Sequence, residues 1–221
     1  MRKISYLLLA AAGGALTIPA VLAQSMGGAD TRRVRITYEN LTTGQAFSPS
    51  VFMSHNSSAP PLFTMGGRAS HGLARLAEDG NVAPIADMAG QMMGRSTHHS
   101  MIGLPTMPRR TTTVEVEVSR SHPMVSGGWM LSMTNDGFTG INAVNAYQLR
   151  EPRTIDVMAY DAGSERNNER RSYLVALMGI QRDPENGTIA RHSGINGRAD
   201  APAAWRFDPA RPVARVTITP L

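Results

Sequence analysis

The chain has 221 residues, a formal net charge of +5 and 42% hydrophobic residues, and it contains no cysteine. The absence of thiols excludes thiol catalysis, thiolate metal sites and Fe–S clusters, and the mild positive charge gives no argument for nucleic-acid binding. A chain of this length forms a domain with a substantial core and does not need disulfides.

The first 23 residues have the pattern of a leader. Arg2 and Lys3 precede an apolar stretch, and Val21 and Ala23 stand at the positions that a signal peptidase reads. The stretch is interrupted and too short for a membrane span of about 20 apolar residues. We therefore expect residues 1–23 to be a cleaved signal peptide and the protein to be periplasmic or extracellular. No transmembrane segment is expected after its removal.

The sequence after the leader begins with strand patterns. We expect residues 24–31 to be a flexible lead-in to a single domain over residues 32–221. In "RRVRITYENL" (32–41) apolar and polar residues alternate, which predicts a strand with one buried face. "AFSPSVFMSHN" (46–56) predicts a second strand, which Pro49 would confine to a sheet edge or a bulge.

Two short helices are predicted next. Residues 70–79 place Leu73 and Leu76 at helical spacing and end before Gly80, a common helix stop. Residues 81–93 predict a second short helix. It runs into a Met- and His-rich stretch without a clear period, which predicts a long connection.

The rest of the chain returns to strand patterns. "TTTVEVEVS" (111–119) alternates valines with glutamates and threonines and is the clearest strand in the sequence. Further strands are predicted at 128–133, 141–149, 154–161 and 212–219. Short strands of this kind with few helices indicate a mainly β protein, an antiparallel β-sandwich with short helical insertions.

Acidic side chains follow two of the predicted strands. "TNDGFTG" (134–140) contains Asp136, and "YDAGSERNNE" (160–169) contains Asp161 and Glu165. Hard cations such as Ca²⁺ bind six to eight oxygen ligands, so three carboxylates at one end of a sandwich would suit such an ion. Asp and Gly are equally common in ordinary turns, and the residues alone leave both interpretations open.

Five segments, in this order, carry a family resemblance: "VRITYENLTTGQAFSPSVFMSHN", "ASHGLARLAEDGN", "TNDGFTGINAV", "YDAGSERNNE" and "ARHSGINGR" followed by "FDPARPVARVTI". Together they resemble the spondin domain over about residues 32–219. The resemblance implies a C2-like antiparallel β-sandwich that holds Ca²⁺ in its end loops, with Asp136, Asp161 and Glu165 as the metal-binding acids. Animal members have Asp in place of Glu165 and carry cysteines that this chain lacks, so their disulfides do not carry over.

The leader and the resemblance lead to one functional hypothesis. The protein is expected to be an exported calcium-binding module that recognises an extracellular or envelope protein or glycan, as an adhesion domain does. No serine has a G-x-S-x-G setting, and we do not expect an enzyme. His192, in "ARHSGING", is expected to orient its loop through a hydrogen bond.

Two alternatives remain open at this point. The stretch 88–108 contains His98 and His99 among several methionines, and imidazole with thioether is a ligand set for copper, so a periplasmic copper-binding protein is one alternative. Methionine nevertheless fills cores more often than it binds metal. The other alternative is an enzyme in which a metal held by the three acids activates water.

Overall fold

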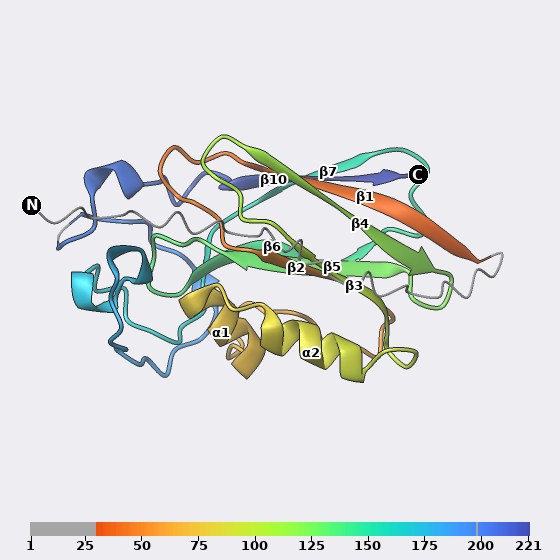
Figure 1. Cartoon of the computed structure of the whole chain (residues 1–221), viewed down its shortest axis with the longest axis horizontal. Helices are drawn as coiled ribbons and strands as arrows, with labels where there is room; N and C mark the ends of the chain where they lie inside the picture. The colour runs from red at the N-terminus through yellow and green to blue at the C-terminus, as the bar shows by residue number, and fades with distance from the viewer. Residues whose placement is uncertain (1–29, 198) are drawn as a thin grey trace, which may run out of the picture.

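The computed structural model describes residues 30–197 and 199–221 (Figure 1). The predicted signal peptide, and the predicted lead-in up to residue 29, lie outside these residues and stay predictions. The described chain forms ten strands in two antiparallel sheets with two α-helices. The prediction of a mainly β fold, an antiparallel β-sandwich with short helical insertions, is confirmed.

The two sheets form the two layers of the sandwich. The four-stranded sheet has the order β4-β1-β10-β7, with β1 (Thr31–Asn40), β4 (Thr111–Ser119), β7 (Arg153–Val157) and β10 (Ala214–Pro220). The six-stranded sheet has the order β3-β2-β5-β6-β8-β9, with β2 (Ser50–His55), β3 (Thr97–Gly103), β5 (Met124–Met130), β6 (Gly137–Asn145), β8 (Tyr160–Asp161) and β9 (Ala190–Arg191).

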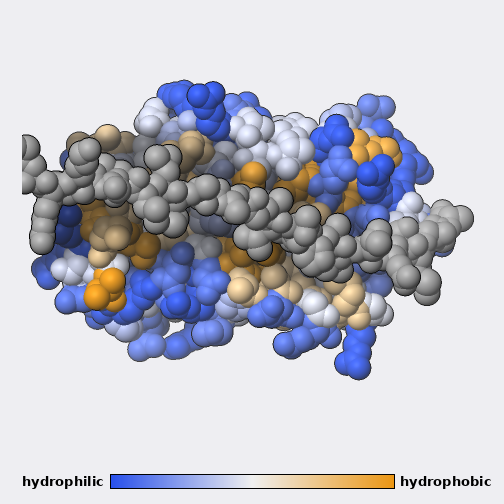
Figure 2. Space-filling model, viewed as in Figure 1, coloured by the Kyte–Doolittle hydropathy of each residue, from blue (hydrophilic) through white to orange (hydrophobic). Residues whose placement is uncertain are grey.

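The main core fills the space between the two sheets. Trp129 is fully buried there and stacks on Tyr38 at 4.7 Å between ring centroids, with Phe47 and Phe52 packed around it. The alternation seen in the sequence of β1 and β4 sends their apolar residues into this core and leaves the arginines of β1 outside. In the view of Figure 2, hydrophilic residues cover most of the rim of the molecule and hydrophobic residues lie mainly along its middle.

Two helices cover the outer face of the six-stranded sheet (Figure 1). They are α1 (His71–Asp79) and α2 (Ala83–Gln91). The hydroxyl of Ser70 caps α1 by accepting a hydrogen bond from the backbone N–H of Leu73, and Gly80 ends the helix with a left-handed backbone at φ 67°. Leu73 and Leu76 are buried against the sheet in a second core, together with Phe138 of β6. This packing brings the C-terminal end of α1 close to β6.

Three short 3₁₀ helices lie in the C-terminal third of the chain: η1 (Arg171–Tyr173), η2 (Val175–Leu177) and η3 (Ala203–Trp205). None of the described helices is long and apolar enough to cross a bilayer.

Several predicted strands have different limits in the structure. Pro49 lies just before β2, and β2 is an inner strand between β3 and β5, so the predicted edge position is wrong; a bulge does occur in its pairing with β3, at Ser54/His55 and away from Pro49. The stretch 88–108 was predicted to be a long connection, yet it contains β3. The segment 154–161 is split, because β7 belongs to the four-stranded sheet and β8 to the six-stranded sheet. This crossing from one sheet to the other places Asp161 beside β6.

Candidate functional site

The two acidic loops predicted from the sequence meet at the paired ends of β6 and β8. Gly137 is the register partner of Asp161, and the backbone N–H of Ala162 donates to the carbonyl oxygen of Asp136 at 3.2 Å. Asp136 therefore lies directly before β6 and beside Asp161, the last residue of β8. The pairing of β6 with β8 thus brings the two loops together at one end of the six-stranded sheet.

A tight turn holds Asp136 in place. The hydroxyl of Thr134 donates to the carbonyl oxygen of Leu131 at 2.7 Å and accepts from the N–H of Gly137 at 2.8 Å. A Cβ atom at Gly137 would meet the side chains of Thr134 and His192, so this glycine allows a close approach. The loop was predicted to span residues 134–140, but Gly137 already begins β6.

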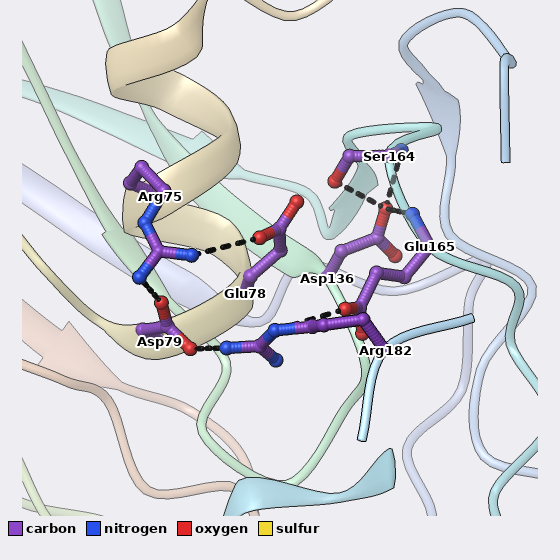
Figure 3. A network of polar contacts seen from close by, with 7 residues as sticks. All are labelled: Arg75, Glu78, Asp79, Asp136, Ser164, Glu165 and Arg182. Atoms are coloured by element: carbon purple, nitrogen blue, oxygen red, sulfur yellow. Dashed lines mark hydrogen bonds and ion pairs between the residues drawn. The ribbon is translucent and has the colours of Figure 1, made fainter. Parts of the chain in front are cut away.

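The carboxyl group of Asp136 is fully buried and only half satisfied. Its Oδ2 accepts three hydrogen bonds, from the N–H and the hydroxyl of Ser164 at 2.8 and 3.0 Å and from the N–H of Glu165 at 2.9 Å (Figure 3). Its Oδ1 is buried without a hydrogen-bond partner in the described chain. Burial and the charge of Asp161 raise the pKa of Asp136 to about 7, although the three donors act in the opposite direction.

Glu165 is the second buried carboxylate of the site. The residue is 1% exposed, and neither of its carboxylate oxygens has a hydrogen-bond partner among residues 30–197 and 199–221. Arg182 forms an ion pair with it at 3.3 Å between Nε and Oε1. Burial and then the negative charges of Glu78 and Asp136 raise the pKa of Glu165 to about 8. One shared guanidinium does not offset this concentration of negative charge.

The end of α1 extends the acidic network (Figure 3). Arg182 also pairs with Asp79, and Arg75 pairs with both Glu78 and Asp79. Together the two arginines pair with three carboxylates, of which only Asp79 contacts both arginines and one is the buried Glu165. This part of the site could not be found from residue spacing, because α1 lies more than 50 residues from Asp136 in the chain.

Asp161 is engaged by its own loop. Its Oδ1 accepts from the N–H of Gly163 at 2.7 Å, and its Oδ2 accepts from the side-chain amide of Asn167. These contacts are the turn chemistry that was the simpler interpretation of "YDAG". Asp161 therefore acts on Asp136 through its charge while its oxygens stabilise the turn.

His192 and Glu169 both form hydrogen bonds that fix the neighbouring loop 192–197. The Nδ1 atom of His192 accepts from the N–H of Gly194 at 2.9 Å, which confirms the predicted loop-orienting hydrogen bond. Burial lowers the pKa of His192 to about 4, so the ring is neutral at physiological pH. The carboxylate of Glu169 accepts from the N–H groups of Asn196 and Gly197 and fixes the same loop.

Residues 37–173, more than half of the chain, match the family model described as Spondin_N. The chain belongs to the Spondin_N family. The matched span contains all three predicted metal ligands, and it ends before β9 and β10, earlier than the resemblance in the sequence had indicated. No curated protein matches the chain significantly.

In this Spondin_N domain the predicted metal ligands lie near one another but do not form a complete cage. Across residues 30–197 and 199–221, no group of three or more His, Asp or Glu side chains is arranged to hold one metal ion. Asp136 and Glu165 present three carboxylate oxygens without hydrogen-bond partners, whereas both oxygens of Asp161 are engaged. Two buried carboxylates with open oxygens fit a hard cation chemically. Each oxygen of Asp161 accepts one hydrogen bond and keeps a further lone pair with which it could join them.

The residues of the alternative copper site, His98 and His99, lie on β3 at a bulge. The pairing with β2 shifts from Ser54–His99 to His55–Thr97, so His98 is an extra residue and the usual alternation of side chains does not hold there. His98 stacks on His122 at 5.7 Å between ring centroids, and the ring nitrogens of His122 lie within hydrogen-bonding distance of Arg95 and Ser121. Among the described residues of this Spondin_N domain, no three His, Asp or Glu side chains gather around these histidines to hold an ion, and the copper alternative stays a prediction.

Proposed function

We propose that this Spondin_N domain is an exported, non-catalytic module that binds Ca²⁺ at Asp136 and Glu165, with Asp161 as a further ligand. The bound ion would order the loops at this end of the sandwich for the recognition of an extracellular or envelope protein or glycan. Family membership supports a non-catalytic domain of the extracellular type. The leader pattern of residues 1–23 supports export.

The observation that carries the proposal is the pair of buried carboxyl groups with open oxygens. A buried polar atom without a partner is costly, and native proteins rarely keep several of them in one place without a ligand. Oδ1 of Asp136 and Oε2 of Glu165 are such atoms, Oε1 of Glu165 has only the ion pair with Arg182, and the charge of Asp136 raises the cost of ionising Glu165. A divalent cation would supply the missing positive charge and accept these oxygens as ligands.

A calcium titration of the purified mature protein tests the proposal. We expect the melting temperature to rise with Ca²⁺ after treatment with EDTA, and to rise much less with Mg²⁺, which demands a smaller and more regular oxygen shell. The rise should be lost in Asp136→Asn and in Glu165→Gln. Asp87→Asn is the matched control, because it removes one exposed carboxylate from α2 and should leave the calcium response unchanged.

Two outcomes would refute the calcium site. One is a melting temperature that does not respond to Ca²⁺ in the wild type. The other is an equal response in the wild type and in both site variants, which would place calcium elsewhere. Metal analysis of protein purified without chelators then tests whether the ion is retained from the cell.

A further inference from the structure

A hollow of about 570 Å³ lies on the opposite sheet from the acidic site and shares no residue with it. It is formed where β1 and β7 end and β10 begins, because Asn40 and Val157 both pair with Ala214. Four arginines line it: Arg109, Arg206, Arg211 and Arg215.

The positive charge of this hollow is only partly neutralised. Arg215 donates two hydrogen bonds to Asp156, at 2.8 and 3.2 Å, so these two groups form a bidentate pair. The side chains of Arg109, Arg206 and Arg211 form no ion pair within the described part of the chain. The only other acid in the lining is Asp208, so three guanidinium groups face one carboxylate.

Two of these arginines have distinctive local surroundings. Arg109 has a left-handed backbone with φ 58°, which is unfavourable for a side chain of this size, and its N–H donates to the carbonyl oxygen of Asn40 at 3.0 Å. Arg206 has an ordinary extended backbone and packs its guanidinium against Gly197, where a Cβ atom would lie 2.5 Å from Nη2. The guanidinium of Arg206 therefore has a packing contact beside the hollow, while Arg109 and Arg211 are exposed at its lining.

We propose that this hollow binds a tetrahedral oxyanion, the phosphate or sulfate group of a small molecule. Guanidinium groups donate in a planar fork that matches phosphate and sulfate oxygens, and three forks from two connections, β3–β4 and η3–β10, suit an anion with three or more free oxygens better than a planar carboxylate. The apolar side chains of Leu41, Phe207 and Val213 line the same hollow and provide a surface for the body of the ligand.

Isothermal titration at low ionic strength tests this site, with inorganic phosphate and glucose 6-phosphate as probes. The double variant Arg206→Gln/Arg211→Gln should bind phosphate at least about tenfold more weakly than the wild type, because it loses two sets of charge-assisted hydrogen bonds. The matched control is Arg120→Gln/Arg150→Gln. These arginines line another hollow of about 500 Å³, where Arg120 is already paired with Asp30, and the control removes the same charge.

Arg109→Gly separates binding from folding. Glycine adopts a positive φ without strain, so the variant should keep its melting temperature while phosphate binding weakens about tenfold. Unchanged phosphate binding in this variant would overturn the proposal. So would an equal loss in the double variant and in its control, which would show only general attraction of anions, or no binding of either probe to the wild type.

The source of the anion is decided by comparing probes on the same variants. Tighter binding of glucose 6-phosphate than of inorganic phosphate would support a small phosphorylated ligand. Binding to vesicles containing phosphatidic acid, lost in the double variant and kept in the control, would support a lipid headgroup as the source of the same oxyanion.

Discussion

Replacing Asp136 by asparagine tests the electrostatics of the acidic site directly. Asp136 is fully buried, and its pKa is raised from the ordinary value of 3.8 to about 7. At about 1.4 kcal/mol for each factor of ten in acidity, ionising this carboxyl group costs about 4 kcal/mol more in the folded protein than in the unfolded chain. Asparagine keeps the shape of the side chain and removes the charge.

The sign of the effect follows from proton binding. The folded protein holds the proton of Asp136 more tightly than the unfolded chain does, so the free energy of unfolding falls as the pH rises from about 4 to about 7. The asparagine variant has no such proton. In EDTA, the difference in unfolding free energy between variant and wild type should therefore shift by about 4 kcal/mol in favour of the variant between pH 4 and pH 8.

Urea unfolding across this pH range, with EDTA or with excess Ca²⁺, provides the measurement. At pH 8 a hundredfold excess of free Ca²⁺ over its dissociation constant should stabilise the wild type by about 2.7 kcal/mol and the variant by much less. A difference curve in EDTA that stays flat from pH 4 to pH 8 would refute the electrostatic reasoning. Equal calcium gains in both proteins would refute the role of Asp136 as a ligand.

Three further substitutions test the fold. Gly140→Ala should lower the free energy of unfolding by at least about 2 kcal/mol, because its Cβ would clash with the backbone of Gly127 on β5; an unchanged melting temperature would contradict this. Gly90→Ala should raise it by about 1 kcal/mol, since this exposed helix position has open space around it within the described chain; a loss of stability would count against the observed end of α2. Tyr38→Phe should cost about 1 kcal/mol, because it removes a hydroxyl that donates to the carbonyl oxygen of Leu104 at 3.0 Å and bonds to Ser50 at 2.9 Å; thermal melts that superimpose would show that these bonds contribute nothing.

Predictions from sequence were accurate where one face of an element meets solvent. In β1 and β4 the polar residues alternate with the buried ones, and α1 has buried leucines at helical spacing and a glycine stop. These patterns are local, so they can be read without knowing the partners of the element.

Predictions were incomplete where an element is covered on both faces or changes sheet: the strand expected over residues 46–56 is present as β2, but inside the sheet. Every residue of β2 is buried, because the core lies on one side and the helices on the other, so no alternation remains. β3 gave no clear period although it pairs with β2 over its length. The division of residues 154–161 between two sheets has no local signal, since it depends on which strands lie nearby.

By itself the sequence determined the fold class and, with the family resemblance, the three acids of the candidate site, because strand periodicity and acidic turn motifs are properties of short segments. Only the tertiary structure decided how these acids differ. Asp161 is satisfied within its own loop, whereas Asp136 and Glu165 are buried with open oxygens beside Arg182 and the end of α1. Burial and charge depend on segments far apart in the chain, and both are set only when those segments pack together.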